Sequence, residues 1–194
     1  GKGDDKDGAS SACFVRRLDL SNNAIGDEGI ECLTRSLEKN GKLLRDERAL
    51  LPALAIADNN IGEKSCAKMI EALSRNGGIK ELDVSRNKAS CQLLIALAEG
   101  LEKHGVGCSL ERLICQDCDL RDKGVRRLVQ AINKQRFHNL THIDLRQNSI
   151  DKKLLQKLNQ AINEGISASS ADLVAEAGKI KEKDPGLAAL LLEK

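Results

Sequence analysis

Apolar residues recur along the chain in five blocks that share the same internal spacing. The blocks align on one residue each: Asn23, Asn59, Asn87, Cys118 and Asn148. Eight, five and three positions before this residue the side chain is apolar, which predicts a short strand with one buried face. From seven positions after it, apolar residues return in steps of three and four, which predicts an amphipathic helix. Each block is therefore expected to be one strand followed by one helix.

The blocks begin near residues 15, 51, 79, 110 and 140, so the period is about 30 residues, as expected for a strand-plus-helix repeat. Neighbouring strands lie about 4.8 Å apart, whereas neighbouring helices need about 8 to 10 Å. A stack of such repeats must therefore curve. The predicted fold is an α/β right-handed solenoid of about five repeats, with parallel strands on the concave side and helices on the convex side.

Short phrases carry a resemblance to a known family. Leu18-Asp-Leu20-Ser-Asn-Asn23 and Leu82-Asp-Val84-Ser-Arg-Asn87 resemble the leucine-rich repeat pattern LxxLxLxxN/C. Together with Gly26-Asp-Glu-Gly29 and Asp122-Lys-Gly124, they resemble the ribonuclease-inhibitor-like subclass. Its members include ribonuclease inhibitor, the Ran GTPase-activating protein, tropomodulins and the sensor arms of NOD-like receptors. The resemblance covers about residues 13 to 165.

The chain divides into three parts. Residues 1–12 are polar and are expected to be disordered. Residues 13–165 form the predicted leucine-rich-repeat domain, in which the connection 38–50 is longer than the others and serves either as a binding loop or as an extra turn of helix. Residues 166–194 are expected to form a helical cap or tail, because Leu173, Val174, Ala177 and Ile180 share one helical face. This part either covers the open end of the solenoid or docks elsewhere.

Composition narrows the partner and the compartment. The only aromatic residues are Phe14 and Phe137, so the Trp and Tyr anchors of tight interfaces are missing, and nucleic acid is disfavoured for lack of stacking side chains. The sequence contains no run of 18 apolar residues, so no membrane span is predicted. Residues 1–12 lack the apolar core of a signal peptide. Seven cysteines, several in core columns, are interpreted as small buried hydrophobes in a reducing compartment. The protein is expected to be cytoplasmic, with cytoskeletal association left open.

The sequence offers little chemistry. Cys115-x-x-Cys118 has the spacing of a metal or redox pair, but both cysteines occupy structural columns of the repeat, and no histidine stands at ligand spacing. Motifs for phosphate binding, zinc proteases and serine hydrolases are missing. We therefore predict no enzymatic activity, no metal and no cofactor. Arg86, Arg121 and Arg146 follow the strands and would be the charge donors if the chain acted on a GTPase.

Strand positions that point away from the core define a candidate binding surface. Repeat two presents only alanines there, which predicts a bare strip that a partner backbone can approach. Ile114 is expected to be an exposed aliphatic side chain on an otherwise polar surface. Opposite charges on adjacent strands, such as Glu81 and Arg112, should partly neutralise each other. The candidate partner-binding residues are Ala53, Ala55, Ala57, Glu81, Asp83, Arg112, Ile114, Gln116, His142 and Arg146.

Positive charge gathers in the last two repeats. Residues 121–157 carry a net charge of +7, whereas the rest of the chain sums to −5. The predicted helices hold most of this excess, which is either a solvated helix face or a patch that attracts an acidic protein surface. The residues of this predicted basic patch are Lys123, Arg126, Arg127, Lys134, Lys152, Lys153 and Lys157.

These observations favour a non-enzymatic protein-protein interaction module, a scaffold or adaptor that binds a protein through the concave sheet and adjoining loops. The family's range makes a cytoskeletal or axonemal partner plausible. Two alternatives stay open: a regulator of a small GTPase, and a fragment of the sensor arm of a NOD-like receptor.

Overall fold

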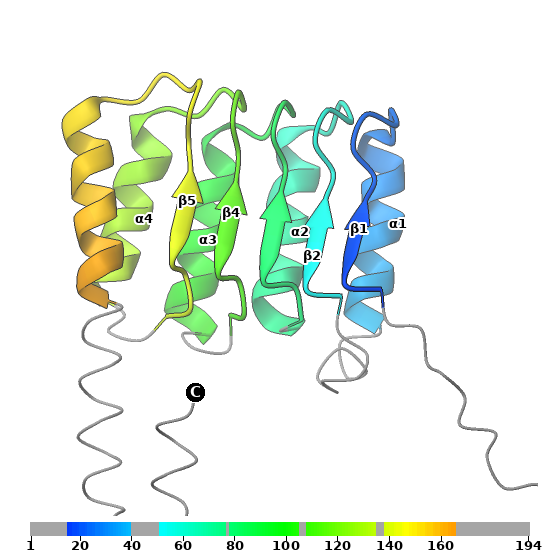
Figure 1. Cartoon of the computed structure of the whole chain (residues 1–194), viewed down its shortest axis with the longest axis horizontal. Coiled ribbons are helices and arrows are strands. Elements are labelled where there is room, and N and C mark those ends of the chain that lie inside the picture. Colours follow the sequence, from blue (N-terminus) through cyan, green and yellow to red (C-terminus); the bar gives the residue numbers. More distant parts are fainter. Residues whose placement is uncertain (1–14, 40–50, 77, 105–107, 135–137, 166–194) are drawn as a thin grey trace, which may run out of the picture.

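Five short strands form one parallel sheet, and helices cover one of its faces (Figure 1). This computed structural model describes residues 15–39, 51–76, 78–104, 108–134 and 138–165. The strands are β1 (Arg17–Asp19), β2 (Ala53–Ala55), β3 (Glu81–Asp83), β4 (Arg112–Ile114) and β5 (His142–Asp144). The helices are α1 (Gly26–Lys39), α2 (Glu63–Asn76), α3 (Ser90–His104) and α4 (Asp122–Lys134), and residues 152–165 form a fifth helical segment.

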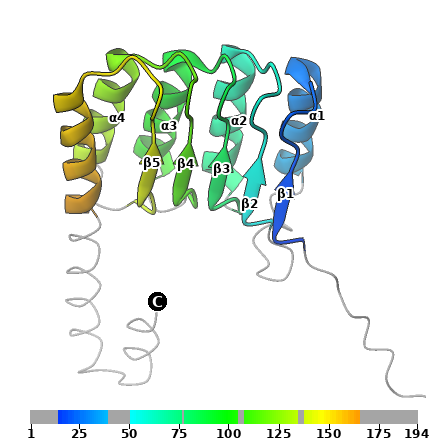
Figure 2. The same ribbon diagram turned by 45° about the horizontal axis from the view of Figure 1, so that its top comes forward.

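Strands follow one another in chain order, β1-β2-β3-β4-β5, so each repeat stacks on the next. Equivalent residues stand side by side: Leu18 pairs with Leu54, Leu54 with Leu82, and Leu82 with Leu113. One side of the molecule is therefore lined by strands, the strand face, and the other by helices, the helix face (Figure 2). The predicted α/β solenoid of about five repeats is confirmed.

The predicted apolar columns form the core between sheet and helices. Leu54, Leu82 and Leu113 of the strands and Ile30, Met69 and Leu128 of the helices are almost completely buried. The prediction that the first apolar position of each repeat is buried is wrong at Val15. Its surface is 57% exposed, although the equivalent Ile79 and Leu110 are buried. Each repeat buries its apolar residues against both neighbours, and Val15 has a neighbouring repeat on one side only among the described residues.

Asn59, Asn87 and Asn148, each of which follows a strand, tie adjacent repeats together. Asn87 Oδ1 accepts hydrogen bonds from the backbone N–H groups of Asn59 and Ile61, both at 3.0 Å, and its Nδ2 donates to the Ile56 and Val84 carbonyls. Asn59 and Asn148 repeat this arrangement. One amide can do this because it both donates and accepts. Each asparagine side chain therefore supplies hydrogen-bond partners for backbone N–H and C=O groups in the turns that leave the sheet.

Small residues let consecutive helices approach closely. A Cβ atom added to Gly124 of α4 would lie 3.1 Å from the Cys91 carbonyl oxygen and 3.2 Å from the Leu94 Cβ of α3. A Cβ atom on Gly100 of α3 would lie 2.6 Å from the Ser74 Cβ of α2. Helix α1 packs less closely on α2 than α2 packs on α3. The helix layer is consequently tight in its middle and more open at its first pair.

Three predictions fall on segments outside the described residues. They are the disorder of 1–12, the binding loop or extra turn of helix in 38–50, of which only residues 38 and 39 are described, and the helical cap or tail formed by 166–194. Within the described part, no helix is long and apolar enough to cross a membrane.

Candidate protein-binding surfaces

An ion-pair network crosses the strand face over the alanines of β2. Arg17 of β1 reaches past Ala53 to Glu81 of β3, with Nη1 2.8 Å from Oε1. Arg112 of β4 approaches the same carboxylate from the other side, with Nε 3.7 Å from Oε2. The predicted Glu81–Arg112 neutralisation is therefore present, and Glu81 is shared between two arginines.

The prediction that repeat two presents a bare alanine strip is wrong for two of its three residues. Ala55 is 2% exposed and Ala57 is 5% exposed, while Ala53 is half-buried. Longer side chains on both flanking strands cover these methyl groups. Ala55 stands between Asp19 and Asp83, and Ser21 Oγ accepts a hydrogen bond from the Ala57 N–H at 3.2 Å. Ala55 and Ala57 are therefore buried because their neighbours on both sides have longer side chains.

Ile114 lies between polar side chains of β3 and β5, and it is half-buried where the sequence predicts an exposed aliphatic side chain. Its sheet neighbours in register are Asp83 and Asp144. Gln116 Nε2 donates to Asp144 Oδ2 at 2.8 Å, and the Arg146 guanidinium donates to both Asp144 oxygens. The guanidinium of Arg146 lowers the pKa of Asp144 to about 2, so this carboxylate is charged at neutral pH. An apolar side chain is thus bordered by hydrogen-bonded charges.

His142 stands at the exposed edge of the sheet, on β5. Together with Asp144, Arg146 and Leu155 it lines a hollow of about 390 Å³ between β5 and the helical segment 152–165. The candidate residues of repeats three to five therefore share one face and continue to the edge of the described sheet. Arg17, which the candidate set left out, joins them through Glu81.

Each of the three arginines considered for phosphate chemistry lies beside a carboxylate. Arg146 pairs with Asp144 at 2.7 Å, Arg121 with Asp119 at 3.5 Å, and Arg86 with Asp58 at 3.9 Å. They come from three different repeats. A phosphate would have to displace a neighbouring carboxylate to bind any one of them.

The predicted basic patch is partly neutralised by an acid that lies outside the counted segment. Arg127 donates two hydrogen bonds to Glu102 of α3, at 2.9 and 2.6 Å, and Lys134 approaches the same carboxylate at 3.3 Å. Arg126 pairs with Asp122 one turn earlier. The free basic residues of the patch are the exposed Lys123, Lys152, Lys153 and Lys157, which have no ion pair among the described residues. The structure thus removes Arg127 and Lys134 from the patch as free charges, because helix packing brings Glu102 against them.

Cys66, Cys115 and Cys118 are buried in the structural columns that the repeat predicts for them. Burial raises the pKa of the Cys66 thiol to about 12 and that of Cys118 to about 11, and it raises the pKa of Cys115 well above its ordinary value. Protonated, buried thiols are poor nucleophiles and poor metal ligands. Cys118 replaces the asparagine of the repeat, and its Sγ lies 3.4 Å from the carbonyls of Val84 and Gln116. No group of three potential metal ligands occurs in the described part of the chain.

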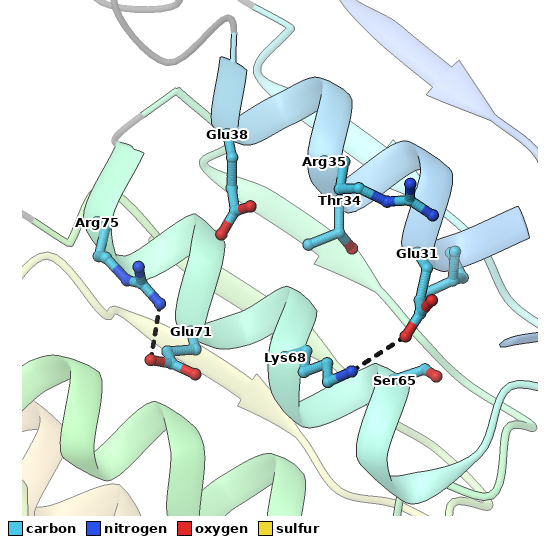
Figure 3. A pocket seen from close by; sticks show the side chains of 9 residues that line it. Glu31, Thr34, Arg35, Glu38, Ser65, Lys68, Glu71 and Arg75 are labelled. Atoms are coloured by element: carbon cyan, nitrogen blue, oxygen red, sulfur yellow. Dashed lines mark hydrogen bonds and ion pairs between the residues drawn. The ribbon is translucent and has the colours of Figure 1, made fainter. Parts of the chain in front are cut away.

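A groove between α1 and α2 was not found from the sequence. It encloses about 290 Å³ on the helix face (Figure 3). Ile30, Thr34 and Ser65 form its buried floor, and charged residues of both helices form its rim. The signal that could have revealed it is Thr34, a hydroxyl at a helix position where the next three repeats hold Ile70, Ala98 and Val129.

Comparisons with known proteins agree with this architecture. The family described as Leucine Rich repeat matches residues 11–33. Ribonuclease inhibitor of Sus scrofa is 32% identical over 100 residues, covering 52% of this chain. "NACHT, LRR and PYD domains-containing protein 14" of Mus musculus is 31% identical over 148 residues, covering 76% of this chain. The chain spans only 20% and 14% of the lengths of these two relatives.

A solved structure shows the same fold. "Leiomodin-1 Actin-Binding Site 2 (ABS2)" superimposes with a TM-score of 0.50 at 12% identity, covering 74% of this chain and 95% of that one. The chain is a leucine-rich repeat protein of the ribonuclease-inhibitor-like type. Such repeats are typically a non-catalytic fold for protein interaction.

Proposed function

We propose that the chain is a non-catalytic scaffold or adaptor module that binds a protein partner on the strand face of repeats three to five. Ile114 is the observation that carries this proposal. It is an aliphatic side chain bordered by Asp83, Asp144 and Gln116. An apolar centre within a polar rim is the usual anatomy of a protein interface.

The partner that fits this surface brings an apolar side chain to Ile114 and polar groups to its surroundings. Charges around Ile114 already have partners within the chain, Glu81 with two arginines and Asp144 with Arg146. Paired charges contribute specificity more than affinity, so the contact should be modest in strength. A cytoskeletal partner is one candidate, because the similar leiomodin fragment is described as actin-binding.

The test is affinity purification from the native cell with the tagged full chain and quantitative mass spectrometry. Ile114→Asp should lose the specific partner, because a charge at the apolar centre would be desolvated on binding. Ile95→Asp is the matched control, since Ile95 is also a half-buried aliphatic residue but belongs to α3 on the helix face. The proposal fails if Ile114→Asp folds, as circular dichroism would show, and retains every partner.

The salt dependence of partner capture distinguishes binding at this surface from binding at the basic helices. Capture through Ile114 should survive 0.5 M salt, because apolar contacts are not screened. Capture through the free lysines of the patch should be lost. In that outcome the partner is an acidic protein bound at Lys123, Lys152, Lys153 and Lys157.

The second candidate function is the repeat arm of a larger NOD-like receptor. Its support is the 31% identity to a NACHT, LRR and PYD domains-containing protein over 148 residues. The native polypeptide, detected with an antibody against residues 108–165, should then be much larger than 21.0 kDa. Peptides from a nucleotide-binding domain should appear in the same band. A native band near 21 kDa would exclude this candidate.

A further inference from the structure

The groove between α1 and α2 contains a buried hydroxyl that no described group satisfies. Thr34 is 7% exposed, and its Oγ1 has no hydrogen-bond partner among the described residues. Figure 3 shows this side chain pointing from α1 into the space between the two helices. A buried polar atom without a partner costs stability. The cost is avoidable, because the equivalent positions of the next three repeats hold the apolar residues Ile70, Ala98 and Val129.

Glu38, on the rim of the same groove, is a free carboxylate. It has no ion pair among the described residues, although two basic residues of α2 line the groove with it. Lys68 is engaged by Glu31 at 3.0 Å, and Arg75 is engaged by Glu71 at 2.7 Å. Arg75 contacts only Oε1 of Glu71, so the other oxygen is available. In Figure 3 the Glu38 carboxylate points toward α2, while the Arg35 guanidinium is directed away from it.

The repeat itself shows what such a carboxylate binds. Glu102 of α3 occupies the same position of its repeat as Glu38, fifteen residues after the aligned residue. It receives two hydrogen bonds from the Arg127 guanidinium and a third from Lys134. An arginine therefore fills this position between α3 and α4. Between α1 and α2 the helices are less closely packed, and no side chain of the described residues fills it.

We propose that the α1–α2 groove is a docking pocket for an arginine side chain of a protein partner. The guanidinium donates to the Glu38 carboxylate, to the free oxygen of Glu71 and to Thr34 Oγ1, and the aliphatic stem packs over Ile30. A guanidinium suits this arrangement because it presents five N–H donors in one plane and no acceptor. The pocket lies on the helix face, whereas the surface proposed above lies on the strand face. The two sites can therefore bind different parts of one partner or two partners at once.

The experiment titrates N-acetyl-L-arginine amide onto the ¹⁵N-labelled full chain and follows the amide signals by NMR. The expected result is saturable shifts of Thr34, Glu38 and Glu71, with no such shifts for N-acetyl-citrulline amide, which has the same shape without the charge. Thr34→Val should weaken binding about tenfold, the effect of one hydrogen bond to a charged group. Glu38→Gln should weaken it about threefold to fivefold, as for a solvent-accessible ion pair.

Two controls keep the result specific. Glu28→Gln removes the same charge from α1 but lies outside the groove, so binding should be unchanged. Val at position 34 preserves the fold, because Val129 occupies the equivalent position of α4. The proposal is wrong if shifts spread evenly over surface acids, if Thr34→Val binds as well as wild type, or if N-acetyl-glutamate amide binds the groove instead. Loss of the Ile114-dependent partner leaves this measurement unaffected.

Discussion

The helix pairs α1–α2 and α3–α4 carry acids and bases at the same positions of the repeat, yet they use them differently. In α3–α4, Glu102 holds Arg127 and Lys134 across the interface. In α1–α2, the equivalent Glu38 has no ion pair among the described residues, and the two bases pair with Glu31 and Glu71. The first arrangement closes the helix layer, and the second leaves a groove.

The difference follows from the small residues beneath the charges. Gly124 of α4 and Ala98 of α3 allow close approach, and both are buried. The equivalent residues of α1–α2 are Ser65 and Thr34, whose hydroxyls occupy the floor of the groove. Charge positions alone therefore do not define a surface. The spacing of the helices decides whether a carboxylate is satisfied within the chain or is available to a partner.

The largest expected effect is at the closest contact of α3–α4. Gly124→Leu should reduce the free energy of unfolding by about 2 kcal/mol, because its side chain would meet the backbone of Cys91 and force the helices apart. The matched change Ser65→Leu, at the same repeat position of α2, should cost no more than about 1 kcal/mol, since the groove has room. Urea unfolding measures both. Equal losses would contradict the difference in packing.

The next effect separates the two equivalent glutamates. Glu102→Gln should cost about 1 to 2 kcal/mol at pH 7, because the partly buried Arg127 loses its charged partner, a cost reduced by the 25% and 28% exposure of the two side chains. Glu38→Gln should change stability by less than about 0.3 kcal/mol, as expected for an unpaired surface charge. Urea denaturation at pH 7 provides the measurement. A comparable loss for Glu38→Gln would mean that Glu38 is paired within the chain.

The Glu102 contribution should also depend on pH. Hydrogen bonds from Arg127 and then Lys134 lower the pKa of Glu102 from 4.5 to about 2. The folded state binds the proton less tightly than the unfolded state, so the contribution is complete above about pH 4.5 and is lost as pH falls toward 2. The stability gap between wild type and Glu102→Gln should therefore narrow between pH 6 and pH 2.5. A constant gap would show that the loss at pH 7 does not come from charge.

A smaller effect, of opposite sign, is expected on the floor of the groove. Thr34→Val should raise the free energy of unfolding by about 1 kcal/mol, because it removes a buried hydroxyl without a partner. Ala98→Thr, at the equivalent position of α3, should lower it by about 1 to 2 kcal/mol, because it adds a hydroxyl to a fully buried site. Thermal unfolding monitored by circular dichroism gives both values. If Thr34→Val destabilises the chain, the hydroxyl has a structural partner.

The smallest effect is expected for the ion pair at one end of the groove. Lys68→Gln removes the contact with Glu31, but both side chains are well exposed, so the change should stay below about 0.5 kcal/mol. It should not alter unfolding in 1 M salt, where exposed pairs are screened. A loss above 1 kcal/mol would show that Glu31 and Lys68 hold α1 on α2.

Much of the fold could be predicted from residue spacing. The columns that contain Leu54, Leu82 and Leu113 lie in register in the sheet, as the repeats imply. Asn59, Asn87 and Asn148 connect adjacent turns, and Cys118 stands in the same column. These features depend on residues close in sequence and on the identical surroundings of each repeat. Periodicity therefore describes them well.

The candidate site was less predictable, because it depends on the lengths and directions of side chains from different repeats. Spacing placed Ala55 on the strand face, but it could not show that flanking strands bury it. Spacing also placed Arg127 in a patch of basic residues, although its charge is neutralised by an ion pair with Glu102 of the preceding helix. Contacts between repeats about 25 to 64 residues apart decide these cases.

The sequence by itself determined the repeat, the order of strands and helices, and the residues that fill the core, since hydrophobic burial follows a local period. Only the tertiary structure decided which charges are free and where the surface is open. Arg17 covers Ala53 because three strands lie side by side in register. Glu38 has no ion pair among the described residues, because α1 packs less closely on α2 than α3 packs on α4. Both outcomes depend on distances between repeats, which the period of a sequence does not contain.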